Sequence, residues 1–280
     1  MTVQLPLASA ARAKSDDSLG SHEVAPDIAY LRTVLVNVVF VGPRQAGDRG
    51  WVLIDSGIIG AADSIREAAE KRFGHGARPA AIVQTHGHFD HVGALETLSR
   101  EWEVPVYAHP LEIPYLSGKA DYPPPDAAAD GGMMPKLAPL FPRSPVDVSE
   151  RLNILPEDGT VPFMAGWQWL HTPGHTPGHI SLWRSSDRSM IVGDAFITTG
   201  QESAYEVMIQ ELEMHGPPRY FTPNWAAAAG SVRLLAAHQP RLVVTGHGRA
   251  ASGPEMLTAL QKLAQDFDSI APPEHLRRAG

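Results

Sequence analysis

The densest group of metal-ligand side chains in this sequence is the run THGHFDH, from Thr85 to His91. Three imidazoles and one carboxylate lie within six residues, directly after a short apolar stretch that predicts a buried strand. A helix would not put all four side chains on one face, but a loop at the carboxyl end of a strand can turn them toward one point. The run therefore predicts a metal site built from His86, His88, Asp90 and His91.

Potential ligands also follow three later strands. The run HTPGHTPGH, from His171 to His179, is a short repeat whose prolines exclude a regular helix, so we expect one histidine to be a ligand and two to be structural. Asp194 and His247 each come at the end of a short apolar stretch. Each of these would be an ordinary turn residue alone. Together with the first run, they make four strands that each end in a potential ligand.

The composition limits the chemistry that is available. The chain has 280 residues with 13 histidines and no cysteine, which excludes disulfides, thiolate zinc fingers, cysteine-bound iron–sulfur clusters and cysteine nucleophiles. It carries 23 Lys+Arg and 31 Asp+Glu, a formal net charge of −8, which is a poor match for nucleic-acid phosphates. We therefore expect a small-molecule substrate and no nucleic-acid partner.

The sequence favours a cytoplasmic protein without a membrane partner. The longest apolar stretch, from Thr33 to Gly42, falls short of the roughly 20 residues that a membrane span needs. The amino terminus has no basic residue before Arg12, and its apolar stretch is short and contains Pro6, so it does not resemble a signal peptide.

The elements that position the ligands alternate between strands and helices. Strands are predicted at 34–41, 51–54, 81–84, 104–108, 152–155, 167–170, 180–183, 190–192 and 242–244, and helices at 61–73, 92–101, 225–238 and 254–267. This alternation predicts α/β layering, an α+β fold with one core over residues 27–280 rather than two independent domains. Residues 1–26 are expected to be a flexible amino-terminal arm.

Regular patterns fail between residues 110 and 150, where prolines are frequent. A loop this long in a compact domain is usually functional or disordered. One interpretation is a plain surface excursion. The other is a lid or pocket wall, because the segment carries apolar side chains that a solvated linker would lack, among them Met133, Met134 and Phe141. The oligomeric state stays open, and this segment would permit a dimer.

The four strand-end motifs together resemble the metallo-β-lactamase superfamily, from about Leu31 to Phe267. The resemblance implies a four-layer αββα sandwich with a metal site along one edge. It also implies two sets of ligands, His86, His88 and His175 for one metal and Asp90, His91 and His247 for the other, with Asp194 bridging the two. Asp55 and His179 would support the ligands without binding the metals.

The implied ligands predict two Zn²⁺ ions per chain, with Fe or Mn as alternatives, because all are nitrogen or oxygen donors. A metal pair lowers the pKa of a bridging water, so that hydroxide can attack a carbonyl group near neutral pH. Asp90 is the expected catalytic residue, because it would orient the hydroxide and pass a proton to the leaving group.

Departures from particular branches of the family narrow the reaction. Asp194, in a chain without cysteine, disfavours a true β-lactamase. The short stretch after His247 disfavours glyoxalase II, and residues 195–197 lack the tyrosine that lactonases often carry there. We expect a lactonase- or esterase-like hydrolase of a small hydrophobic ester, lactone or thioester, with Phe196 joining Met133, Met134 and Phe141 in the pocket. The alternatives are phosphodiesterase or weak β-lactamase activity, a mononuclear iron dioxygenase, and a non-catalytic metal-binding protein.

Overall fold

The chain folds into two compact units. The computed structural model describes residues 5–129, 143, 146–200 and 212–277. The amino-terminal unit comprises residues 14–122 and 142–169, and the carboxyl-terminal unit comprises residues 1–13, 123–141 and 170–280. Each unit has an apolar core of its own, whereas the sequence analysis predicted a single core. The patterns mark which residues are apolar, but they do not say which apolar residues pack together.

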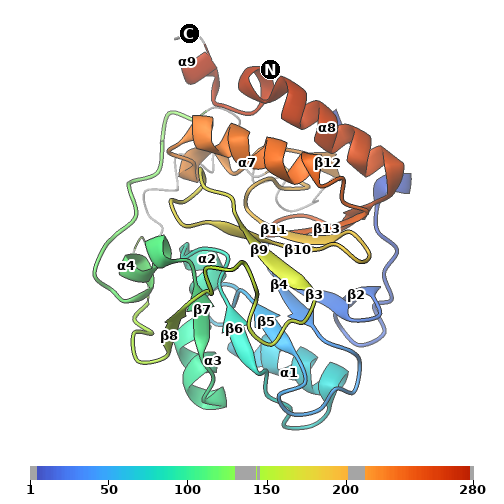
Figure 1. Ribbon diagram of the computed structural model, residues 1–280, viewed down its shortest axis with the longest axis vertical. Helices are drawn as coiled ribbons and strands as arrows, with labels where there is room; N and C mark the ends of the chain where they lie inside the picture. Colours follow the sequence, from blue (N-terminus) through green and yellow to red (C-terminus); the bar gives the residue numbers. More distant parts are fainter. Residues whose placement is uncertain (1–4, 130–142, 144–145, 201–211, 278–280) are drawn as a thin grey trace. The chain divides into compact units, whose positions relative to one another are not determined.

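A seven-stranded sheet forms the centre of the amino-terminal unit (Figure 1). Its strands, in spatial order, are β2 (His22–Ala25), β3 (Ile28–Thr33), β4 (Val36–Val41), β5 (Val52–Ile54), β6 (Ala81–Val83), β7 (Val106–Ala108) and β8 (Leu152–Ile154). Neighbours from β2 to β5 are antiparallel, and neighbours from β5 to β8 are parallel. The carboxyl ends of the parallel strands therefore lie at one edge, where loops can carry a site.

Helices α1 (Ala62–Phe73) and α3 (Leu95–Trp102) pack their apolar faces against this sheet. Trp51 lies at the centre of that core. Its ring stacks on Phe73 with centroids 4.3 Å apart and meets Trp102 edge-on at 5.8 Å, so one aromatic cluster joins both helices to the sheet. The shorter helices of the unit are α2 (Phe89–Val92), η2 (Pro110–Glu112) and α4 (Ile113–Leu116).

The carboxyl-terminal unit contributes β14 (Ala251–Ser252), β13 (Leu242–Thr245), β11 (Ser189–Gly193) and β10 (Ile180–Arg184), in that order, to a five-stranded sheet. The last strand of this sheet is β9 (Trp167–His171), which begins before the boundary between the units at residue 170. β11 and β13 are parallel neighbours. Figure 1 shows α7 (Trp225–Ala237) and α8 (Gly253–Ile270) side by side over this sheet. Smaller elements are β1 (Leu5–Pro6), β12 (Glu213–Met214), η1 (Ser9–Ala11), η4 (Arg219–Phe221) and α9 (Glu274–Arg277).

The prediction of a flexible amino-terminal arm is wrong for residues 5–26, which are the part of the arm that the structure describes. Leu5 and Pro6 pair with β12, and β2 forms one edge of the seven-stranded sheet. Glu23 on β2 is buried, and its carboxylate accepts hydrogen bonds from Nε of Arg72 on α1 at 2.9 and 3.1 Å. A partner 49 positions away leaves no local signal in the sequence.

The predicted strand at 34–41 begins only at Val36. Val34 has a left-handed backbone, with φ at 67°, and forms with Leu35 the turn between β3 and β4. A β-branched residue is unusual in that conformation, so its strand propensity was misleading. The predicted lid residues Met133, Met134 and Phe141 lie outside the described residues.

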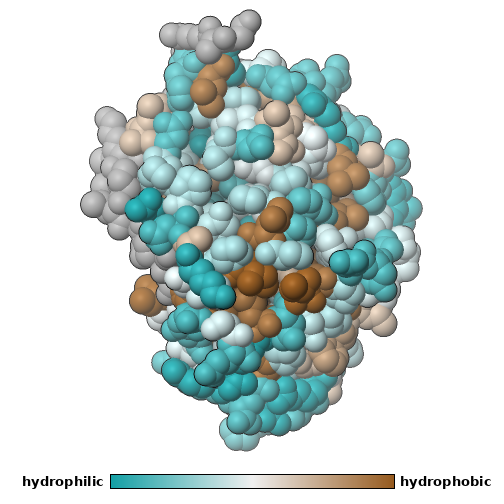
Figure 2. Space-filling view, turned by 60° about the vertical axis from the view of Figure 1, so that its left-hand side comes forward, coloured by the Kyte–Doolittle hydropathy of each residue, from teal (hydrophilic) through white to brown (hydrophobic). Residues whose placement is uncertain are grey.

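On the face drawn in Figure 2 most of the described residues are hydrophilic, and apolar residues gather near the centre of the view. Over all of the described residues, the large exposed apolar side chains are Val34, Ile59, Leu111, Ile154, Phe163, Leu234 and Leu276. No helix in the described ranges combines the length and the hydropathy needed to cross a bilayer.

The buried ion pair between Glu23 and Arg72 should make the first strand essential to stability. In a Glu23→Gln variant the Arg72 guanidinium loses its counter-charge in the interior, and we expect a loss of about 3 kcal/mol or more. Urea unfolding followed by tryptophan fluorescence measures the change. Glu67→Gln, which removes an exposed pair with Lys71, is the matched control and should leave the midpoint unchanged. Equal midpoints for the two variants would contradict the structural role of β2.

Candidate metal centre

The THGHFDH run forms the loop from β6 into α2 in the amino-terminal unit. His86 and His91 are fully buried, and His88 is nearly so. The ring centroid of His86 lies 4.8 Å from that of His88 and 4.2 Å from that of His91. Asp90, in the first turn of α2, is only half-buried. One short loop therefore brings three imidazoles together and keeps a carboxylate accessible from outside.

Asp55 supports this loop from the end of the neighbouring strand. Because β5 and β6 are parallel neighbours, Asp55 after β5 lies beside Thr85 after β6. Its carboxylate accepts hydrogen bonds from the backbone N–H of Thr85, from the Thr85 hydroxyl and from Nδ1 of His91, each at 2.8 Å. Both oxygens of Asp55 are thus engaged within the loop, as expected of a residue that orients ligands.

These contacts determine which nitrogen of each imidazole is left for a metal. The Thr85 hydroxyl gives its hydrogen to Asp55, so Nδ1 of His86, 3.0 Å from that hydroxyl, must be the donor to it. Nδ1 of His91 donates directly to Asp55. In both residues Nε2 therefore remains as the atom that can bind a metal.

The HTPGHTPGH run forms the loop between β9 and β10. Nε2 of His171 donates to the carbonyl of Pro177 at 2.9 Å and so closes the loop. Gly174 has φ at 135°, and a Cβ there would collide with the backbone of Ala228 on α7. This close approach needs glycine, and it fixes the following residue, His175, against the helix.

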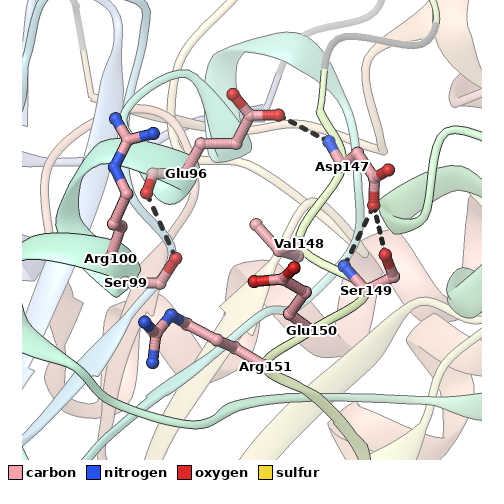
Figure 3. Close-up of a pocket in the computed structure, with 8 residues that line it drawn as sticks. All are labelled: Glu96, Ser99, Arg100, Asp147, Val148, Ser149, Glu150 and Arg151. Atoms are coloured by element: carbon pink, nitrogen blue, oxygen red, sulfur yellow. Dashed lines mark hydrogen bonds between the residues drawn. The ribbon is translucent and has the colours of Figure 1, made fainter.

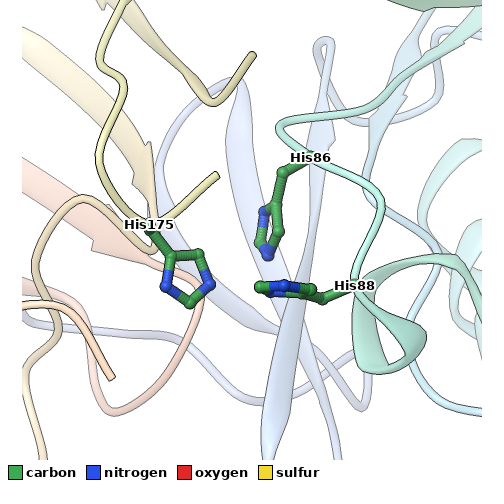
Figure 4. Close-up of side chains that lie close together, drawn as sticks. All are labelled: His86, His88 and His175. Atoms are coloured by element: carbon green, nitrogen blue, oxygen red, sulfur yellow. The ribbon is translucent and has the colours of Figure 1, made fainter. Parts of the chain in front are cut away.

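His175 is oriented in the same way as His86. The Thr222 hydroxyl donates to the carbonyl of Pro218 at 2.7 Å, so it can only accept from Nδ1 of His175, 3.1 Å away. Nε2 of His175 is the nitrogen that remains for a metal. Figure 4 draws the His175 ring together with those of His86 and His88.

Asp194 follows β11, and His247 follows the parallel neighbour β13. One oxygen of Asp194, Oδ2, lies 3.4 Å from Nε2 of His175 and 3.2 Å from Nε2 of His247, and all three side chains are almost fully buried. A buried carboxylate is costly unless a positive charge offsets it. A cation bound by the carboxylate oxygen and the two imidazole nitrogens would stabilise this group.

His179 holds Asp194 from behind. Nε2 of His179 accepts the backbone N–H of Asp194 at 2.9 Å, so Nδ1 must carry the hydrogen and donates it to Thr172. The Thr172 hydroxyl then donates to Ser181, whose hydroxyl donates to the carbonyl of Val192 at 3.1 Å. Both nitrogens of His179 are therefore engaged in these hydrogen bonds.

The donor groups fit a hard or borderline metal ion. The candidate donors are His86, His88, Asp90 and His91 in the amino-terminal unit and His175, Asp194 and His247 in the carboxyl-terminal unit. All are nitrogen or oxygen donors, which Zn²⁺, Fe and Mn accept. The sequence did not reveal the hydroxyls of Thr85, Thr172 and Thr222, because their partners depend on the fold.

Tyr122 is a further neighbour of the loop that the sequence did not reveal. Its ring lies 4.5 Å from that of His88. Burial raises the pKa of its hydroxyl well above the usual range, and the adjacent Glu112 carboxylate adds to the shift, so the hydroxyl keeps its hydrogen. No residue type or spacing marks this tyrosine in the sequence.

Of the predicted substrate-pocket residues, only Phe196 lies within the described residues. Phe196 is fully buried in the apolar core of the carboxyl-terminal unit, where it stabilises the fold and leaves no exposed face for a substrate. A cavity of about 410 Å³ in the amino-terminal unit contains none of the predicted site residues (Figure 3). Its charges are mixed, and Asp147 there has a lowered pKa because it accepts hydrogen bonds from Ser149.

Comparison with known proteins extends over most of the chain. A family model described as the metallo-beta-lactamase superfamily matches residues 31–247. The chain is 46% identical over 248 residues to "Probable metallo-hydrolase YflN" of Bacillus subtilis (strain 168), covering 89% of this chain and 94% of that protein. It is 28% identical over 196 residues to "Probable metallo-hydrolase YybB" of the same organism, covering 70% and 74%.

Solved structures agree with this match. TTHA1623, crystallised in a di-iron-bound form, is 28% identical with a TM-score of 0.51, covering 82% of this chain and 95% of that one. A beta-lactamase domain protein from Burkholderia ambifaria is 22% identical with a TM-score of 0.61, covering 95% and 77%, and shows similarity of fold alone. The fold expected from the sequence is confirmed.

The contact with Thr222 predicts a hydrogen on Nδ1 of His175 in the metal-free protein. Long-range ¹H–¹⁵N NMR of the imidazoles reports this directly. In a Thr222→Val variant the acceptor is lost, and Nδ1 should no longer be uniformly protonated. Thr258→Val is the matched control, because that exposed hydroxyl also donates to a proline carbonyl four positions back, and it should leave the His175 signals unchanged. A bare Nδ1 at His175 in the unmodified protein would contradict the assignment.

Proposed function

Because this chain is a metallo-hydrolase of the metallo-β-lactamase superfamily, we propose that it binds two zinc ions and cleaves an ester, lactone or thioester of a small hydrophobic molecule. The observation that carries the proposal is the buried carboxylate of Asp194, which has Nε2 of His175 and Nε2 of His247 around one oxygen. A carboxylate has two oxygen atoms and can therefore be shared between two metal ions.

We assign the remaining donors to the two ions as the resemblance to the family implies. His86, His88 and His175 would hold the first ion, and Asp90, His91 and His247 would hold the second, with Asp194 shared between them. The hydrogen bonds of the imidazoles indicate which atom would bind a metal, because His86, His91 and His175 each engage Nδ1, so that Nε2 would be the ligand atom. The di-iron form of TTHA1623 makes iron the main alternative to zinc.

When bound, a metal pair lowers the pKa of water and polarises the oxygen of a carbonyl group. The chain itself would provide the proton transfer. Asp90 is half-buried, whereas the other proposed donors are buried, so its carboxylate is the one that incoming substrate can reach. An oxygen of Asp90 would take up the proton of the attacking water and pass it to the leaving group.

The rest of the proposed machinery keeps these groups in place. Asp55 holds the loop before α2, and His179 holds the backbone of Asp194. We further propose a small molecule rather than a nucleic acid as the substrate, because the formal net charge of −8 would repel phosphate backbones. The cytoplasmic location stays a prediction.

Metal content and substrate class can be tested on the purified chain. We expect elemental analysis to find two zinc ions per chain. We expect turnover of lactones, esters or thioesters to exceed that of a phosphodiester and a chromogenic cephalosporin, and to stop when a chelator removes the metal. A single iron per chain would favour the dioxygenase alternative. Folded protein that contains no metal would contradict the proposal.

Replacement of Asp90 tests its role in proton transfer. We expect Asp90→Ala to lower turnover by at least about 100-fold, because a positioned general acid–base is lost, while at least one metal ion is retained. Asp63→Ala is the matched control, since Asp63 also lies in the first turn of a helix but is exposed. Full activity of Asp90→Ala would show that the assignment is wrong.

A further inference from the structure

Two buried residues that the proposed chemistry does not use, Glu112 and Tyr122, converge on the middle of the metal loop. Glu112 ends η2 and is fully buried, and Tyr122 follows α4 and is 4% exposed. The backbone N–H of Gly87 donates to Oε2 of Glu112 at 3.0 Å and to the hydroxyl oxygen of Tyr122 at 2.9 Å. The Tyr122 hydroxyl donates in turn to the same oxygen of Glu112.

We propose that Glu112 and Tyr122 are positioning residues that fix the peptide between His86 and His88, and that they thereby set the affinity for the metal ion held by these two histidines. The identity of that ion's ligands rests on the proposed function. The hydrogen bonds to Gly87 do not, because they lie within the amino-terminal unit and involve no metal.

The energetic reason lies in the burial of Glu112. A carboxylate away from water is stable only when donors surround it. Two of the donors to Glu112 are the N–H of Gly87 and the hydroxyl of Tyr122. If the loop moves, a buried acceptor loses a donor, which opposes the movement. The loop and the two residues are therefore coupled.

The packing around Gly87 points the same way. A Cβ built at Gly87 would come within 2.7 Å of the Tyr122 hydroxyl oxygen and 3.3 Å of Cδ2 of Leu116. The tyrosine thus fills the space beside the backbone and leaves no room for a side chain. The loop is held by contact as well as by hydrogen bonds.

Tyr122 also contacts a proposed ligand directly. Its ring centroid lies 4.5 Å from that of His88, and the Tyr115 ring stacks on it with centroids 3.8 Å apart and an interplanar angle of 12°. The backbone and the ring of His88 are thus both oriented from one residue. Replacing a residue that orients a metal ligand without binding the metal typically lowers the metal affinity about 10- to 100-fold.

Metal binding by the full-length chain tests the proposal. Zinc affinity is measured by competition with a chromophoric chelator for the unmodified protein, Tyr122→Phe and Glu112→Gln. We expect both variants to bind one of two zinc ions about 10- to 100-fold more weakly and the other normally. Tyr115→Phe, which keeps the stacked rings but changes the neighbouring hydroxyl, should match the unmodified protein.

Amide hydrogen exchange at Gly87 in the metal-free protein gives a second readout that needs no metal. Loss of the Tyr122 hydroxyl should speed exchange about tenfold, and Tyr115→Phe should not change it. Two zinc ions bound normally by both test variants, or a uniform weakening of both ions, would overturn the proposal. Unmodified protein that binds no zinc would instead contradict the proposed function as well, so the two failures are distinguishable.

Discussion

The candidate centre depends on one buried carboxylate, that of Asp55. Parallel pairing of β5 and β6 puts it beside the start of the metal loop, where it accepts three hydrogen bonds at 2.8 Å. One bond fixes the backbone at Thr85, and one orients His91. In the third bond the Thr85 hydroxyl donates its hydrogen to Asp55. That hydroxyl can therefore only accept a hydrogen bond from Nδ1 of His86. The contacts of a single side chain thus indicate, for both imidazoles, that Nδ1 carries a hydrogen.

The carboxyl-terminal unit uses the same device with different residues. In this unit the final acceptors are backbone carbonyl groups. The Thr222 hydroxyl donates to the carbonyl of Pro218, and the Ser181 hydroxyl donates to the carbonyl of Val192. These two series of hydrogen bonds give Nε2 a different role in His175 and in His179. Nε2 of His175 is left for a ligand, whereas Nε2 of His179 is used to hold the backbone of Asp194. Such fixed hydrogen bonds lower the cost of ordering the donors when an ion binds.

Much of this arrangement could be predicted from the sequence, because the ligand motifs directly follow apolar stretches that become strands. The strands before Asp55, His86, Asp194 and His247 lie close to their predicted positions. The features that the sequence did not predict depend on contacts between residues that are far apart in the chain. The pairing of Glu23 with Arg72 and the contacts of Glu112 and Tyr122 with Gly87 leave no periodic pattern. The division into two cores was missed for the same reason.

Anomalous X-ray scattering from crystals of the full-length protein, measured at the zinc and iron absorption edges, locates the metal ions and identifies the element. We predict two zinc peaks per chain, one contacted by His86, His88 and His175 and the other by Asp90, His91 and His247, with Asp194 contacting both. A peak bound through Nδ1 of His86 or His175, a peak on Asp55 or His179, or no ordered metal among these residues would contradict it.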